Sequence, residues 1–344
     1  MSLYIVFLLL LLVINSKLFV KDYNKDYLSK DNTSAIKGLF ILIVFASHIM
    51  QYALYNNKVD LLGRNLIINI GQLMVTMFLF YSGYGIFESL KRKKDNYMKS
   101  FFKNRIIKTW FNFVIFVVIY LIIDYVLKIN YPIKTKLLSL IGFESVGNSN
   151  WYMFDIIILY FITFISYLLS KKEKIFLIIN LIITFIFFII LYKIKPSWWY
   201  NTLLCYSFGM IFSYFKDAFE SLFINNKKFN NFKYLIVLFI SVILFIILFL
   251  YDKNIILYEA CTLLFCFIIV LFTLKININN KILIYSGKNL FFLYMTQRIP
   301  MIILSNHNYN IHVYKFFLIS FISMFILSYI TSKFINYTNK KCFK

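Results

Sequence analysis

The sequence predicts an all-α membrane protein that crosses the bilayer about eleven times. Hydrophobic residues make up 61% of the 344 residues and charged residues 15%, which leaves too little polar surface to cover a soluble core. The charges lie in short runs between apolar stretches that are long enough to cross a bilayer as helices. These stretches do not alternate polar with apolar residues, so the pattern favours helices over a membrane β-barrel.

Eleven apolar runs follow one another with short loops between them. They lie near residues 3–20, 35–54, 66–90, 107–128, 151–170, 174–192, 199–215, 234–251, 255–274, 282–304 and 314–335. The first run has no basic start and no small-residue cleavage site, so we expect a retained span rather than a signal peptide. The chain then divides into an extra N-terminal transmembrane helix with its linker, residues 1–30, and a single transmembrane domain, residues 31–344.

Lysine and arginine residues sort the loops between the two sides of the membrane. The most basic segment begins with Lys91 and continues to Lys108, and basic loops stay in the cytoplasm. Alternating spans then place the N-terminus outside and the C-terminus inside. The net charge of +23 is explained by this topology and by attraction to anionic membrane lipid, not by nucleic acid. The abundance of Ile, Lys, Asn, Phe and Tyr suggests an AT-rich bacterial genome, and hence a bacterial cytoplasmic membrane.

The longest loop on the predicted outer side, residues 129–150, is rich in glycine and asparagine near its end and leads directly into Trp151. It would either cover a site that opens outward or serve as a plain connection. Trp151, Trp198 and Trp199 fall at the predicted outer ends of helices, where an aromatic belt is expected at the membrane interface.

The cysteines and the glycines give no sign of a metal or nucleotide site. Cys205, Cys261 and Cys266 lie in apolar runs and Cys342 in the tail, without metal-ligand spacing. No Walker loop or dinucleotide-binding fingerprint is present. We therefore expect no metal cofactor.

His48 is the most informative polar residue, because ionisable groups inside a membrane are costly and often functional. Lys37 precedes it by eleven residues, which leaves the two side chains about 20° apart around a helix and about 16 Å apart along it. A cation thus lies at the cytoplasmic edge, in line with an imidazole that can take and return a proton. The alternative is a histidine that simply bonds to a neighbouring helix.

The basic segment ends with two cations at the start of the next span. Arg105 and Lys108 are three residues apart and share a face of a regular helix, which Asn112 continues. Two cations at a helix edge can grip phosphate. The alternative is ordinary basic charge on the cytoplasmic side.

Three further ionisable residues fall inside apolar runs. Asp155 follows Trp151 by one turn, Glu259 lies in the run 255–274, and Arg298 lies beside Gln297. Arg298 would either pair with Asp155 or Glu259, or hold an anionic substrate.

Small and weakly polar residues recur at helical spacing in the run 66–90, at Asn69, Gln72, Thr76 and Gly83. We interpret them as a surface that lets two transmembrane helices pack closely.

Four stretches follow one another along the chain: a basic residue and glycine followed by an apolar run and a histidine (36–48), an apolar segment with Ser-Gly-aromatic (78–84), an aromatic-then-basic entry to a span (101–108), and a Trp-aromatic start of a span (150–153). A weaker motif follows at 286–294. In this order they resemble acyltransferase family 3, a family of integral membrane proteins that O-acylate bacterial surface glycans.

The resemblance implies a ten-helix acyltransferase-like core that follows one extra N-terminal span. It implies a membrane O-acyltransferase that uses acetyl-CoA or another acyl-CoA from the cytoplasmic side. The acceptor would be a hydroxyl of a surface polysaccharide or lipid-linked sugar. His48 would be the essential base or acyl relay, Lys37, Arg105 and Lys108 would hold the donor, and Trp151, Asp155, Glu259 and Arg298 are weaker candidates for binding the acceptor.

The chain departs from the family pattern at a few positions. Lys37 and Lys108 stand where arginine is typical, which keeps the charge but loses bidentate phosphate geometry. Thr296 and Gln297 stand where many members have a histidine, so we give that position no catalytic role.

The alternative function is a flippase or polymerase that handles polysaccharides or lipid-linked oligosaccharides without acyl transfer. A transporter would be expected to show internal repeats and more intramembrane charge. A polymerase would be expected to carry arginines in a large outer loop, and residues 129–150 contain none.

Overall fold

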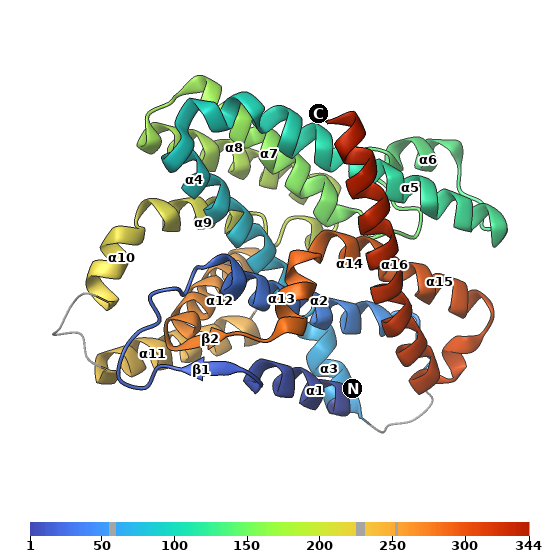
Figure 1. Ribbon diagram of the computed structural model, residues 1–344, viewed down its shortest axis with the longest axis horizontal. Coiled ribbons are helices and arrows are strands. Elements are labelled where there is room, and N and C mark those ends of the chain that lie inside the picture. Colours follow the sequence, from blue (N-terminus) through green and yellow to red (C-terminus); the bar gives the residue numbers. More distant parts are fainter. Residues whose placement is uncertain (55–59, 225–230, 252–253, 344) are drawn as a thin grey trace.

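The computed structural model describes residues 1–54, 60–224, 231–251 and 254–343, and these residues are almost entirely helical (Figure 1). The longer helices are α2 (Lys30–Ile49), α4 (Leu73–Phe101), α5 (Lys108–Val126), α7 (Trp151–Leu169), α8 (Glu173–Ile194), α11 (Asn231–Leu250), α12 (Ile255–Lys275) and α16 (Val313–Cys342). The shorter ones are α1 (Ser2–Val13), α3 (Leu61–Ile70), α6 (Ile133–Ser139), α9 (Leu204–Tyr214), α10 (Lys216–Phe223), α13 (Lys281–Lys288), α14 (Leu290–Thr296) and α15 (Arg298–Asn306). Three helical turns, η1 (Phe102–Ile107), η2 (Ser197–Trp199) and η3 (Tyr309–Ile311), and two strands, β1 (Ser16–Leu18) and β2 (Ile276–Ile278), complete the fold.

The helices confirm an all-α polytopic membrane protein. Among the described residues, seven helical stretches are long and apolar enough to cross a membrane. One of them, Leu61–Val126, runs through α3, α4, η1 and α5 with a kink at Lys94, so it takes up two of the predicted runs. The total of eleven spans stays a prediction, and parts of the expected loops 55–65, 216–233 and 252–254 lie outside the described residues.

The first predicted span differs most from the structure. α1 has twelve residues, so it is about 18 Å long, whereas the hydrocarbon core is about 30 Å thick. The chain then extends as β1, which pairs antiparallel with β2. The terminal amine of Met1 forms an ion pair with Asp60, just before α3. One continuous helix over residues 3–20 is therefore wrong.

The predicted run 282–304 is also divided in the structure. It consists of α13, α14 and α15, which are separated at Asn289 and Gln297. The break at Gln297 places Arg298 at the first residue of a new helix. Discontinuous helices inside a membrane protein commonly line a cavity, where the freed backbone groups find partners.

α2 lies at the centre of the helical assembly. The apolar window of α2 is 78% buried within the chain, whereas the window of α11 is only 11% buried. Ser29 caps the start of α2, because its hydroxyl accepts a hydrogen bond from the backbone N–H of Asn32 at 3.3 Å. Polar residues of α2 are therefore enclosed by protein, whereas α11 presents its apolar side chains outward.

Two pairs of glycines bring helix backbones into direct contact. A methyl group added to Gly38 of α2 would collide with the carbonyl oxygen of Leu283 in α13, and one on Gly287 would collide with α2. Gly83 of α4 and Gly209 of α9 meet each other's helices in the same way. Glycine allows this approach because it has no Cβ, so the close-packing interpretation of Gly83 is confirmed.

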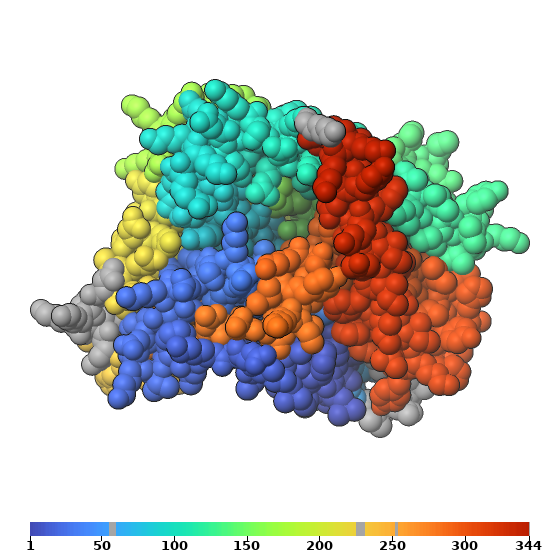
Figure 2. Space-filling model, in the orientation of Figure 1, coloured from blue at the N-terminus to red at the C-terminus, as the bar shows by residue number. Residues whose placement is uncertain are grey.

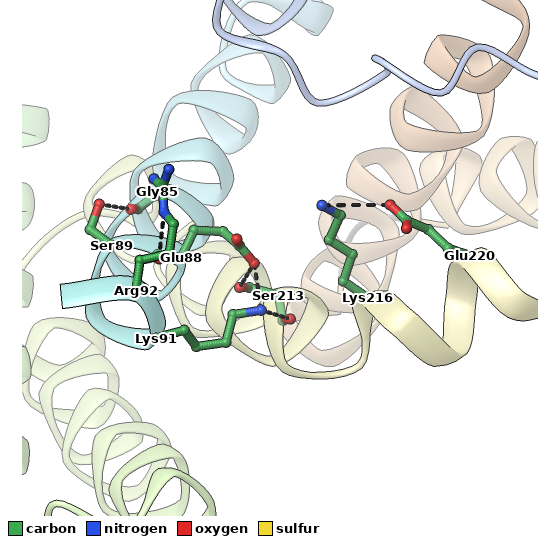
Figure 3. Close-up of polar contacts among 8 residues, drawn as sticks. All are labelled: Gly85, Glu88, Ser89, Lys91, Arg92, Ser213, Lys216 and Glu220. Atoms are coloured by element: carbon green, nitrogen blue, oxygen red, sulfur yellow. Dashed lines mark hydrogen bonds and ion pairs between the residues drawn. The ribbon is translucent and has the colours of Figure 1, made fainter. Parts of the chain in front are cut away.

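A polar network also ties α4 to α9 (Figure 3). Lys91 lies 2.5 Å from the carboxylate of Glu88 and donates to the backbone carbonyl of Ser213 at 2.8 Å. The hydroxyl of Ser213 donates to Glu88 at 2.7 Å. Lys91, the first cation of the predicted cytoplasmic segment, therefore contributes to helix packing.

Candidate functional site

A cavity of about 560 Å³ lies at the C-terminal end of α2. We call it the His48 cavity, because His48 is its ionisable base. Helices α2, α4, α7 and α14 each contribute to its wall, and so does the loop before α7. The sequence left open whether this loop covers a site or is a plain connection, and its residues Ser145, Asn148 and Ser149 line the cavity.

His48 lies in the last turn of α2 and is partly exposed to the cavity. Its Nδ1 atom is buried and has no hydrogen-bond partner among the described residues. The imidazole lies 6.4 Å, between ring centroids, from Tyr294 of α14, and beside Gln297. A histidine with an uncommitted ring nitrogen at a cavity wall has the form of a general base.

The loop before α7 is held in place by hydrogen bonds to several parts of the chain. Lys195 donates to the carbonyl of Phe143 at 2.7 Å, and the side chain of Asn150 donates to the carbonyl of Gly142 at 2.8 Å. The indole of Trp110 donates to the carbonyl of Leu140 at 3.0 Å. The loop is therefore a packed wall of the cavity rather than a plain connection.

Arg298 connects three segments at the edge of the cavity. Its guanidinium donates to the hydroxyl of Ser149 at 2.9 Å, to the hydroxyl of Tyr52 at 3.2 Å and to the amide oxygen of Gln51 at 2.9 Å. It forms none of the ion pairs found among the described residues. The expected pairing of Arg298 with Asp155 or Glu259 is therefore wrong.

Tryptophans contribute to the cavity as well. Trp151, at the start of α7, and Trp198, in η2, both line it. Trp199 instead is 5% exposed, packs on Phe154 with ring centroids 5.6 Å apart, and receives the ammonium of Lys195 at 4.4 Å from its ring. The prediction of an interfacial belt is therefore wrong for Trp199, which lies in the protein interior.

The cations predicted to hold the donor lie at the other end of α2. Lys37 and Arg105 are near enough for their positive charges to repel each other, although 68 positions separate them in the sequence. We call them the cation pair. Two like charges held together favour an anion between them, and both residues belong to motifs that the sequence singled out.

Arg105 lies within η1, a π-helical turn, and Lys108 follows at the first residue of α5. A π-helix bonds residue i to i+5, so residues three apart no longer share a face as they do in an α-helix. Lys108 lies just beyond this turn, and its place on the same face as Arg105 stays a prediction. Figure 2 shows the surface hollowed between the teal run that contains η1, the orange helices α13 and α14, and the red α16.

Asp155 and Glu259 do not line the His48 cavity. Asp155 is fully buried in α7, within electrostatic reach of Tyr152 and Tyr294, and neither of its oxygens has a hydrogen-bond partner among the described residues. Glu259 lies in α12 near Cys205, also without a hydrogen-bond partner for either oxygen. The structure therefore brings Arg298 and Trp151 to His48, but not Glu259.

Two residues that hold Arg298 were not predicted from the sequence. They are Gln51, which lines the cavity, and Tyr52, and both follow the end of α2. Their only local signal is that polar residues gather immediately after His48. Their common location depends on α15, which lies about 250 residues beyond α2.

Comparison with known proteins identifies the family of the chain but no individual relative. The model of an acyltransferase domain family matches residues 32–333, from the start of α2 to the second half of α16. No curated protein and no solved structure matches the chain.

Proposed function

The chain belongs to acyltransferase family 3, a family of membrane acyltransferases, and we propose that it is an O-acyltransferase that uses acyl-CoA. The acyl group, for which we expect acetyl, passes from a cytoplasmic thioester to a hydroxyl of a surface polysaccharide or a lipid-linked sugar. The proposal adds a donor and an acceptor to the acyltransferase activity of the family. It rests on how α2 positions His48 and Lys37.

The proposal rests on the different surroundings of His48 and Lys37, which belong to the same buried helix, α2. His48 lines a cavity and carries a buried ring nitrogen without a hydrogen-bond partner among the described residues, and Lys37 lies about 16 Å before it on the same face, close to Arg105. The cation pair suits the phosphates of coenzyme A. The His48 cavity suits the acceptor, because it is lined by polar side chains and by tryptophan.

In the proposed reaction, His48 takes the proton of the acceptor hydroxyl as its oxygen attacks the thioester carbonyl. A C–O ester bond forms and the C–S bond breaks. The thiolate of coenzyme A leaves and takes up a proton, so the products are an ester and the free thiol. The cation pair holds the phosphates of the donor throughout, and the loop before α7 excludes water from the acceptor.

The test is transfer of labelled acetyl from acetyl-CoA to cell-surface glycan in membranes that contain the protein. His48→Ala should lower the rate about 100- to 10,000-fold, the usual contribution of a general base. His307→Ala is the matched control, because His307 is exposed at the end of α15 and does not line the cavity. Full activity of His48→Ala at equal expression would rule the mechanism out.

A further inference from the structure

The charge of Arg298 is not neutralised by any group that lines the His48 cavity. Its hydrogen bonds go to two hydroxyls and one amide, all of them neutral. The described residues that line the cavity include no aspartate and no glutamate. A guanidinium also has more N–H groups than these three bonds use, so donors remain for a ligand.

Asn148 adds a second donor to the same wall. Its amide oxygen already accepts a hydrogen bond from the backbone N–H of Val146 at 3.1 Å, which fixes the orientation of the amide. Its Nδ2 group is buried and has no partner among the described residues, and the residue is only 3% exposed. Buried donors are rarely left without an acceptor, so this one marks a place for a ligand oxygen.

Gln51 also lines the cavity, and like Asn148 it has an amide oxygen that already accepts a hydrogen bond. Its amide oxygen accepts from Arg298 at 2.9 Å, which leaves its amide N–H groups directed elsewhere. The cavity thus offers one fixed positive charge and neutral donors, with no carboxylate to oppose an anion. Arg298 is also held by two separate segments, at Gln51–Tyr52 and at Ser149, so its position is set before a ligand arrives.

The remaining wall suits a ring. Trp151 and Trp198 both line the cavity, and Trp198 is 50% exposed. An indole face packs well against the C–H face of a pyranose ring. The cavity volume of about 560 Å³ is in the range of small-molecule sites.

We infer that the His48 cavity takes an acidic sugar, whose carboxylate or phosphate binds Arg298 and Asn148 while a ring hydroxyl is presented to His48. The inference rests on the proposed function for the role of the hydroxyl, but the anion site itself does not. It narrows the acceptor from sugars in general to sugars with a negative charge near the acylated hydroxyl.

The experiment measures how tightly sugars bind to the purified full chain in detergent at constant ionic strength. Binding is read from the increase in the thermal stability of the protein. Glucose, glucuronate and glucose 6-phosphate are the three probes, so the carboxylate and phosphate arms are separate. Wild type should bind at least one of the two anionic sugars roughly tenfold or more tightly than glucose, as expected for hydrogen bonds to a charged group. Equal binding of all three probes would overturn the inference.

Three variants show whether Arg298 is responsible. Arg298→Gln should bind the anionic sugars no better than glucose, and Arg298→Lys should retain part of the preference because the charge stays but the fork is lost. Asn148→Asp leaves Arg298 in place but adds a carboxylate beside the ligand, so it should remove the preference even if Arg298→Gln fails to fold. Lys134→Gln, an exposed cation of α6 outside the cavity, should bind like wild type.

Acyl transfer to the same three probes separates this inference from the proposed function. If glucose is acylated as efficiently as the anionic sugars, the anion site is wrong and the acyltransferase stands. If neither these sugars nor cell-surface glycan is acylated but the anionic sugars still bind through Arg298, the anion site stands and the proposed function is wrong.

Discussion

The two ends of α2 differ in how they are built. At the His48 end, residues from six helices, α2, α3, α4, α7, α14 and α15, and a hydrogen-bonded loop enclose a cavity with fixed walls. At the Lys37 end, two cations approach each other, and the helical run that contains Arg105 borders a hollow of the surface (Figure 2). A shaped cavity with one fixed cation, Arg298, selects by fit as well as by charge, whereas the cation pair selects by charge. Under the proposed function, the first end would recognise the acceptor and the second end would recognise the donor.

The contact between α2 and α13 supports both ends, so breaking it should affect them together. Gly38→Ala places a methyl group against the backbone of Leu283, which cannot move without shifting α13. We expect a loss of about 1–3 kcal/mol of stability, as for overpacked cores, with acyl transfer lost in proportion to folded protein. Thermal unfolding in detergent measures the loss.

Gly85→Ala is the matched control for this prediction. Gly85 is also helical, but a Cβ there would meet nothing within 4 Å. The variant should be as stable as wild type or slightly more so, because alanine favours helix. Equal stability of Gly38→Ala and Gly85→Ala would contradict the close contact.

Removing a cation should change donor binding only. Arg105→Ala should raise the KM for acyl-CoA about 10- to 100-fold, since a hydrogen bond to a charged group is lost. The KM for the acceptor should stay constant. Steady-state kinetics with each substrate varied in turn gives both values, and a rise in the acceptor KM alone would reverse the assignment of the two ends.

Removing an aromatic wall should change acceptor binding only, and by less. Trp198→Ala should raise the acceptor KM about 2- to 10-fold, the usual effect of an aromatic contact. Phe334→Ala removes an exposed aromatic side chain of α16 that does not line the cavity. If Phe334→Ala raises the acceptor KM as much as Trp198→Ala, the effect does not come from the cavity wall.

The smallest expected effect is the coupling between the ends. Lys37 and His48 are about 16 Å apart along the helix, beyond the range at which substitutions usually interact. In the double variant, Arg105→Ala with Trp198→Ala, the free-energy changes that correspond to the two single KM changes should therefore add to within about 0.5 kcal/mol. A larger coupling would mean that donor and acceptor share one site.

The parts predicted from the sequence are those set by local spacing. The alignment of Lys37 with His48 follows from helical periodicity and holds because α2 is one unbroken helix. The loop before Trp151 was recognised by its composition, because glycine and asparagine mark irregular backbone. Gly83 was recognised as a packing residue because small and weakly polar residues recur at helical spacing in the run 66–90.

The parts that were not predicted depend on contacts between distant segments. Ser149 and Gln51 are 149 and 247 positions from Arg298, and no pattern in the sequence relates them. The break of the helix at Asn289 has no proline beside it. The π-helical turn that contains Arg105 and precedes Lys108 is also not specified by composition alone.

The most direct test of the account is acyl transfer across a sealed membrane. Inside-out vesicles with glucuronate and glucose 6-phosphate in the lumen receive labelled acetyl-CoA in the medium, and right-side-out vesicles serve as the comparison. The account predicts label on a luminal sugar only in inside-out vesicles, and none with His48→Ala. Label at equal rates in both orientations, or only on sugar in the medium, would contradict the assignment of donor and acceptor to opposite ends of α2.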